Sequence, residues 1–423
     1  MTARPALVGC LAAALALRLA FALFYWVDQP LTHDEREYLA LARSVARGDG
    51  FRYPADEPRP GTAQQFGRAP GYPLFLATLG VMQPAEHAPR RVQIAQAFVG
   101  TVIVLLIASI AARAAGPRAG LVAGAIAAVY PPLVWTPAYV LSETLFSALA
   151  LAVARVLQSL DRGSGVGGRG SGIGHRGSVI AGVLTGAAIL TRPGMVFFLP
   201  FAALWLWRRR RAADAAIFLV VSVLCVAPWT IRNHQVYGRW IAVASEGGVT
   251  YWTGNHPLAI GEGDLAANPE IKRAELAFRA SHPGLTAEEL EPLYYRDAFA
   301  WIREHPGAWL GLIARKAFYT VVPAGPSYAV HSVKYVAASV AAYVLVLAAA
   351  VAGAWRWRAS GRRTGPVPLW LMAASTVAAG LVFFPQERFR IPVIDPALIV
   401  TAALAAGLRH SADYERTHRH TDV

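Results

Sequence analysis

The chain has 423 residues, of which 55% are hydrophobic and 16% are charged, and its mean hydropathy is +0.38. This composition excludes a soluble globular protein of this length and predicts a polytopic membrane protein. The formal net charge of +14 resides mostly in short basic loops between apolar runs, which the positive-inside rule explains better than a nucleic-acid partner does. The two cysteines, Cys10 and Cys225, lie inside apolar runs and predict no disulfide framework.

Ten apolar runs follow one another along the chain, and a run of about 20 residues is long enough to cross a bilayer. The first contains a stretch that resembles a signal peptide, but its apolar residues continue to Val27, which predicts a transmembrane helix. The fifth and sixth are short and meet at Thr191-Arg192-Pro193-Gly194, which predicts a tight hairpin. The predicted fold class is therefore all-α, a polytopic bundle of about ten transmembrane helices. The runs lie near residues 5–27, 91–112, 119–136, 140–160, 178–192, 194–207, 214–231, 333–355, 367–384 and 391–408.

The loops between these runs alternate in charge. Arginine-rich loops fall on one side, which the positive-inside rule assigns to the cytoplasm. The outer side carries two long segments of nearly balanced charge, residues 28–90 and 232–332, which we call the first and second connecting segments. Long ordered loops on a membrane scaffold tend to carry sites, so function is expected there. Residues 1–408 form the predicted transmembrane domain, in which the Gly/Ser/Arg-rich residues 162–178 are a flexible cytoplasmic linker, and residues 409–423 form a cytoplasmic tail.

Near its start, the first connecting segment has four ionisable residues in a row, from His33 to Arg36. Apolar residues at helical spacing follow as far as Gly48. This pattern predicts a short amphipathic helix from Asp34 on the membrane surface. Two interpretations of its acids stay open. Thr32 and Glu35 have the spacing of a capping box, and Asp34 in the first turn favours the helix dipole. Alternatively, Asp34 or Glu35 is a general base, or binds a metal or a substrate hydroxyl.

Other charged residues stand at the outer ends of spans. Arg68 precedes a Pro-Gly-Tyr-Pro turn, whose ordinary explanation is a juxtamembrane turn. Glu143 opens the fourth span, where an acid needs a partner or caps the helix. Arg388 and Arg390 lie in a very short outer loop beside Glu387, against the positive-inside tendency. Their simplest partner is an anion at headgroup level, with an ion pair to Glu387 or a lipid phosphate as the alternative.

In this order, the motifs resemble those of the GT-C superfamily of membrane glycosyltransferases, and specifically the bacterial branch similar to protein O-mannosyltransferases and lipid A aminoarabinose transferases. The resemblance covers most of residues 1–400, and each motif is weak alone. The matching stretches are Asp34-Glu35 with Tyr38 and Leu41, Arg68-Ala-Pro-Gly-Tyr-Pro, Ser142-Glu143, Leu190-Thr-Arg192-Pro193, Ala227-Pro-Trp-Thr-Ile-Arg232-Asn233, Gly247-Gly248, Gly254-Asn-His-Pro257, and Glu387-Arg388-Phe-Arg390 with Pro392.

The resemblance implies a GT-C-like fold and an enzyme that transfers a sugar, with inversion, from a polyprenyl-phosphate donor to an acceptor hydroxyl on the outer face. By resemblance, Asp34 is the base, and Glu35 orients the acceptor or the neighbouring loop. The acceptor is a lipid, a polysaccharide or a protein, and membrane lipids surround the enzyme. Glu143 with Asp34 or Glu35 is a candidate set for a divalent cation, although no dense acidic cluster demands one.

Arginines are expected to stabilise the charge that grows on the departing phosphate, because they need no proton to do so. Arg388 is the first candidate for this role, Arg390 and Arg232 are the next, and Arg68 is the fourth.

Two other hypotheses stay open. A transporter or flippase of lipid-linked saccharide would use the same outer arginines, but it would be expected to carry polar groups deep in several spans, and these spans are mostly Ala, Leu and Val. A relative without chemistry would act as an assembly factor. The 37 arginines against 3 lysines are typical of a GC-rich genome, which predicts a bacterial plasma membrane.

Overall fold

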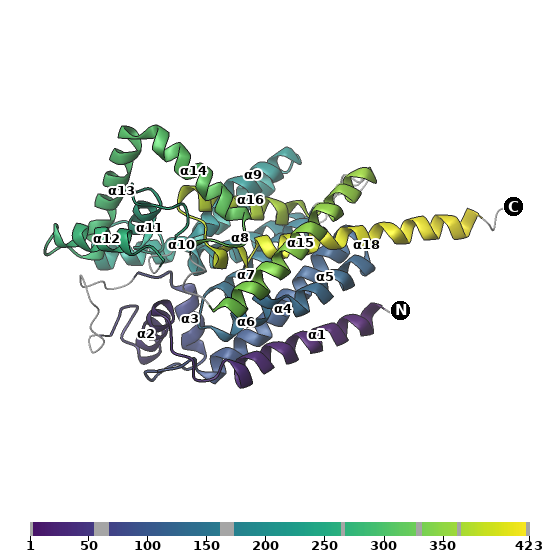
Figure 1. Ribbon diagram of the computed structural model, residues 1–423, viewed down its shortest axis with the longest axis horizontal. Coiled ribbons are helices and arrows are strands. Elements are labelled where there is room, and N and C mark those ends of the chain that lie inside the picture. The colour runs from purple at the N-terminus through teal and green to yellow at the C-terminus, as the bar shows by residue number, and fades with distance from the viewer. Residues whose placement is uncertain are drawn as a thin grey trace.

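The computed structural model describes residues 3–54, 67–160, 173–263, 267–326, 332–361 and 365–419, and all regular structure in these ranges is helical (Figure 1). The predicted apolar runs form α1 (Ala3–Ala20) with the π-helical turn η1 (Phe21–Tyr25), α4 (Arg90–Ala115), α5 (Pro117–Val129), α6 (Pro131–Trp135) with the 3-10 turn η2 (Thr136–Ala138), α7 (Glu143–Leu160), α8 (Ile173–Thr191), η3 (Pro193–Phe197) with α9 (Phe198–Arg208), α10 (Ala212–Tyr237), α15 (Val333–Ala359), α16 (Val367–Val382) and α18 (Ile394–Arg419).

The helices confirm a multi-pass membrane protein. Among the described residues, five helices are long and apolar enough to cross a membrane, or six if the bent pair α5 and α6 counts as one span. Shorter apolar helices cover Pro193–Arg208, Val367–Val382 and Ile394–Leu408. Fewer helices therefore reach the full span length than the ten predicted runs, because several runs are short or interrupted.

Three boundaries differ from the prediction. Of the predicted linker, residues 162–172 lie outside the described ranges, and residues 173–178 begin α8 instead, where Ser178 Oγ donates to Asp214 Oδ1 of α10 at 2.9 Å. The two short runs do not form a tight hairpin, because η3 separates them: α8 packs mainly on α7 and α10, whereas α9 packs on α10 and α16. Helix α18 continues into the predicted tail as far as Arg419, through residues that include no Gly or Pro.

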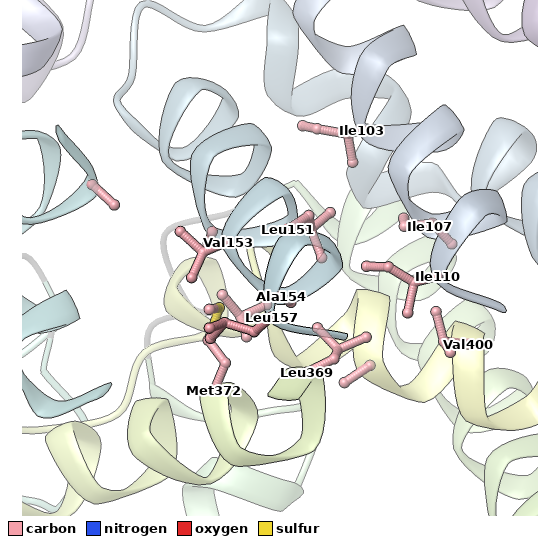
Figure 2. Close-up of a cluster of buried hydrophobic side chains, with 14 of the residues drawn as sticks. Ile103, Ile107, Ile110, Leu151, Val153, Ala154, Leu157, Leu369, Met372 and Val400 are labelled. Carbon is pink, nitrogen blue, oxygen red and sulfur yellow. The ribbon is translucent and has the colours of Figure 1, made fainter. Parts of the chain in front are cut away.

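The core of the bundle lies where α4, α7, α16 and α18 meet. Figure 2 shows aliphatic side chains of these four helices directed toward one another. These side chains are buried in a closely packed core. Small Ala residues lie among the branched ones and let the helices approach each other closely. The labelled members are Ile103, Ile107 and Ile110 of α4, Leu151, Val153, Ala154 and Leu157 of α7, Leu369 and Met372 of α16, and Val400 of α18.

The predicted third span is broken in the middle. Tyr130 adopts an extended conformation before Pro131, as residues before proline favour, and the chain bends by 68° between α5 and the α6–η2 unit. The break frees backbone carbonyls at the end of α5. Arg18 of α1, which is fully buried, donates to the carbonyl oxygens of Ala127 and Ala128 at 3.2 and 3.3 Å. A cation at a helix C-terminus satisfies these groups and suits the dipole.

Both connecting segments lie at the end of the bundle opposite the two termini (Figure 1). The first contains α2 (His33–Arg47) and α3 (Gly71–Thr78), and the second contains α11 (Gly247–Gly254), α12 (Pro269–Ala280), α13 (Ala287–Glu304) and α14 (Pro306–Val321). The short helix α17 (Glu387–Arg390) lies between α16 and α18. The second segment has its own apolar core, which includes Trp252, Leu290 and Tyr294. This end of the molecule collects the residues that the sequence singles out.

Candidate active site

Helix α2 begins with the predicted capping box. Glu35 Oε2 accepts hydrogen bonds from the backbone N and Oγ1 of Thr32 at 2.7 and 2.8 Å, and Thr32 Oγ1 accepts one from the backbone N of Glu35 at 3.4 Å. The other oxygen of Glu35 accepts the backbone N–H of Val140 at 2.8 Å, and the residue is only 3% exposed. Both oxygens of Glu35 are thus occupied in fixing the start of α2 against the loop that precedes α7.

Asp34, one residue earlier, lies between two arginines. Its Oδ1 is 2.6 Å from Arg68 Nη2, and its Oδ2 is 2.6 Å from Arg388 Nη1. Burial alone would raise the pKa of Asp34, but the guanidinium groups of Arg68 and Arg388 outweigh burial and hold that pKa well below its usual range. Three segments that are remote in the sequence therefore meet at one ionised carboxylate.

Arg68 joins the two connecting segments. Besides Asp34, its Nε is 2.6 Å from Glu37 Oε2 on α2, and its Nη1 is 3.3 Å from Glu246 Oε2 at the start of α11. Its guanidinium also lies 5.3 Å from the centre of the Tyr38 ring. A single cation thus satisfies carboxylates of both segments. Glu37 and Glu246 were not among the residues predicted from the sequence. The three-residue spacing from Asp34 was a signal for Glu37, whereas nothing local pointed to Glu246.

Glu143 forms a second ion pair beside the first. Its Oε1 is 2.7 Å from Nη1 of Arg192, which also donates to Ser142 Oγ at 3.4 Å. The Phe389 ring lies between the two ion pairs, since the Arg192 and Arg388 guanidinium carbons are 4.9 and 5.3 Å from its centre. Arg192 belongs to a motif of the resemblance but was not named as a site residue. Its place at the outer end of an apolar run, like that of Arg388, was the available signal.

Gly71 explains how the motifs around Arg68 and Arg192 come together. A Cβ at this position would lie 2.6 Å from Thr191 Oγ1 and 2.9 Å from the Leu190 carbonyl oxygen. Only glycine lets the start of α3 contact the end of α8 this closely.

The other two predicted arginines lie elsewhere. Arg390 is 4% exposed, its Nε is 2.9 Å from Asp395 Oδ1, and its guanidinium lies 3.7 Å from the Tyr343 ring centre, so it faces the interior of the bundle. Arg232 donates to the Phe51 carbonyl oxygen at 3.3 Å and stacks 5.0 Å from the centre of the Trp229 ring. In their described contacts, neither arginine touches Asp34.

The donor set does not fit a divalent cation. Within the described residues, no group of three or more His, Cys, Asp or Glu side chains could hold a metal ion. The three candidate acids have other partners: Asp34 contacts arginines, Glu35 contacts Thr32 and Val140, and Glu143 contacts Arg192. Guanidinium groups supply the positive charge at this place, so no step is assigned to a metal here.

No protein-family model and no curated protein matches the sequence. Among solved structures, the chain is similar to the oligosaccharyltransferase AglB of Archaeoglobus fulgidus, in a complex with an inhibitory peptide and a dolichol-phosphate (TM-score 0.56, 15% identity) and in a form tethered to an acceptor peptide (TM-score 0.59, 15% identity). The matches cover 98% of this chain and 51% and 50% of the AglB chain, so this chain spans about half the length of AglB. ArnT from Cupriavidus metallidurans bound to undecaprenyl phosphate matches at a TM-score of 0.44 and 13% identity, over 94% of this chain and 76% of ArnT. The similarity shows that this chain shares the all-α fold of the matched half of AglB, in agreement with the all-α fold class that the sequence predicts.

Proposed function

We propose that this protein transfers a sugar from a polyprenyl-phosphate donor to an acceptor hydroxyl, with inversion, at the outer face of a bacterial plasma membrane. The observation that carries the proposal is the Asp34 carboxylate in the first turn of α2, which lies 2.6 Å from both Arg68 and Arg388. The fold supports it, because AglB is an oligosaccharyltransferase and was solved in complex with a dolichol-phosphate.

The donor phosphate is assigned to Arg388. A polyprenyl chain remains in the bilayer, so its phosphate stays near the ends of the spanning helices, where α17 lies. Arg388 is partly exposed, and a guanidinium offers a phosphate a fixed fork of donors. As the bond to the sugar breaks, negative charge grows on the phosphate and the positioned cation stabilises it. Arg192, on the same Phe389 ring, adds a second positive charge nearby.

Asp34 is assigned the role of general base. It accepts the proton of the acceptor hydroxyl while the hydroxyl oxygen attacks the anomeric carbon from the side opposite the phosphate. The new carbon–oxygen bond forms as the bond from the anomeric carbon to the phosphate oxygen breaks, and this single displacement inverts the configuration. The products are the glycoside, the polyprenyl phosphate and a protonated Asp34. General base catalysis of this kind contributes about a hundredfold or more.

The acceptor is a lipid, polysaccharide or protein hydroxyl, and its recognition is assigned to the second connecting segment. Glu246 brings that segment to Arg68, next to the base. Glu35 orients the neighbouring loop through Val140 and does not contact substrate in this proposal.

The test is transfer of radiolabelled sugar from a panel of polyprenyl-phosphate sugars into a membrane extract by the purified full-length chain. Wild type should transfer label from at least one donor, and Arg388→Ala should lose at least about a hundredfold of this rate. Arg47→Ala is the control, because Arg47 is exposed and its side chain donates to the carbonyl of Met82. Equal rates for Arg388→Ala and wild type would refute the phosphate assignment. No transfer from any donor, with movement of lipid-linked sugar across vesicles, would favour a flippase instead.

A further inference from the structure

Both oxygens of the Asp34 carboxylate are occupied in this structure. Oδ1 contacts Arg68 and Oδ2 contacts Arg388, each at 2.6 Å. A carboxylate that accepts two charge-assisted hydrogen bonds is strongly held in its ionised form. Such a group is a poor proton acceptor, because an efficient base has a pKa near the working pH. The arrangement seen here is therefore a resting one, and one of the two arginines must move before Asp34 takes a proton.

The two arginines are held unequally. Arg68 pairs with Asp34, Glu37 and Glu246 and has a side chain 17% exposed. Arg388 forms one ion pair, with Asp34, in the part of the chain that the structure describes, and its side chain is 38% exposed. Arg388 Nε also donates a hydrogen bond to Gln386 Oε1 at 3.0 Å. An anion that binds Arg388 therefore has to displace one carboxylate, whereas an anion that binds Arg68 would have to compete with three carboxylates.

We infer that the donor's phosphate activates the base by taking Arg388 away from Asp34, so that donor binding precedes proton transfer. This inference rests on the proposed function. When the phosphate binds Arg388, Oδ2 of Asp34 loses its cation and becomes the oxygen that accepts the acceptor's proton. Arg68 is the positioning residue, because its pairs with Glu37 and Glu246 keep it on Oδ1 and hold the carboxylate in place.

Competition between Asp34 and the phosphate for Arg388 gives the inference its test. The probe is undecaprenyl phosphate, which lacks the sugar and is bound without turnover by the full-length chain in detergent at neutral pH. Asp34→Asn removes the carboxylate that competes for Arg388. The variant should bind this lipid about tenfold more tightly than wild type, because lipid binding no longer has to break the ion pair between Asp34 and Arg388. Glu37→Gln is the matched control: it removes a negative charge from the same helix, but from a residue paired with Arg68. Its affinity should change by less than about threefold.

Each outcome decides between the two proposals. If Arg388→Ala loses binding while Asp34→Asn binds no more tightly than wild type, the exchange is refuted and the phosphate assignment stands. If wild type does not bind the lipid, or Arg388→Ala binds it as wild type does, both are refuted. Tighter binding by Glu37→Gln, equal to that of Asp34→Asn, would reveal a general charge effect and also refute the exchange. Asp34→Ser removes the same carboxylate and replaces Asp34→Asn if that variant does not elute as a monodisperse protein.

Discussion

Arg68 and Arg388 contact the same carboxylate, but their surroundings give them different roles. Arg68 is shared between Asp34 and Glu37 of α2 and Glu246 at the start of α11. Its contacts with three carboxylates favour orientation of the base over binding of a substrate. Arg388 is the more exposed of the two and is the better partner for a phosphate.

Loss of the Glu246 carboxylate should therefore impair catalysis more than donor binding. We expect Glu246→Gln to lower kcat about tenfold and to leave the donor KM within about twofold, because Arg68 would hold Asp34 less firmly. Initial rates at varied donor concentration measure the split. Glu86→Gln is the control, since Glu86 is an exposed acid of the first connecting segment. A raised donor KM with unchanged kcat would show instead that this contact serves phosphate binding.

The residues of the candidate site were predictable to different degrees. Asp34, Arg68 and Arg388 could be singled out, because charged residues at the outer ends of spans need partners. Arg388 was ranked ahead of Arg390 as the phosphate ligand, but only the fold shows which of the two meets Asp34, because a spacing of two on a helix points side chains to different sides. Arg192 was overlooked as a site residue because its partner, Glu143, is remote in the sequence.

At the scale of elements, two close contacts hold the site together. The first is between α3 and α8 at Gly71, where a Cβ would meet Thr191 and Leu190. The second is at the end of α16, the helix that leads to α17. Lys316 of α14, fully buried, donates to the carbonyl oxygens of Leu381 and Val382 at 3.1 and 3.5 Å. These contacts fix the chain on both sides of the two ion pairs.

Substitution of Gly71 by alanine should impair catalysis by displacing residues of the site, without removing any of their functional groups. The added Cβ pushes α3 away from α8, which displaces Arg68 relative to Arg192, and we expect kcat/KM to fall between about tenfold and a hundredfold. Transfer assays on folded, monodisperse protein measure this. Gly194→Ala should be neutral, because a Cβ there meets nothing within 4 Å. Comparable losses in both variants would show that the effect is not specific to the α3–α8 contact.

Lys316 should make the stability depend on pH. Burial lowers the pKa of Lys316 to about 7, whereas an unfolded lysine has a pKa of about 10.4. Between these values the unfolded state binds a proton that the folded state has released, so stability should rise as pH increases from about 7 to about 10. Thermal unfolding followed by tryptophan fluorescence should show this rise in wild type and in Lys316→Met a weaker one. Lys272→Met, at an exposed lysine, should behave as wild type; a rise of equal size in Lys316→Met would contradict the assignment.

At the scale of the whole molecule, both connecting segments lie at the end opposite the termini (Figure 1). The alternation of basic and mixed loops predicts this arrangement, because each span reverses the side of the next loop. The bend at Tyr130 was not predicted, although Pro131 and Pro132 are visible in the sequence. A run of apolar residues indicates length in the membrane, but it does not show whether partners such as Arg18 will satisfy a broken helix.

The side of the membrane can be tested with single cysteines. In a chain carrying Cys10→Ala and Cys225→Ala, a membrane-impermeant maleimide should label Glu86→Cys in intact cells. Arg208→Cys, at the exposed end of α9, should be labelled only after the cells are made permeable. Both positions are exposed, so different labelling reflects sidedness. The reverse pattern would place the candidate site on the cytoplasmic face and contradict the proposed orientation.

The central claim is that Asp34, held between two arginines, is the base of a sugar transfer. The measurement that tests it most directly is the initial rate of transfer from the best polyprenyl-phosphate donor, compared for wild type, Asp34→Asn and Asp49→Asn at equal folded amounts. Asp49 is an exposed aspartate just beyond α2, so Asp49→Asn is the same substitution at a position outside the site. We predict that Asp34→Asn loses at least about a hundredfold of the rate and that Asp49→Asn keeps it. If Asp34→Asn transfers sugar as fast as Asp49→Asn, Asp34 is not the base and the account is contradicted.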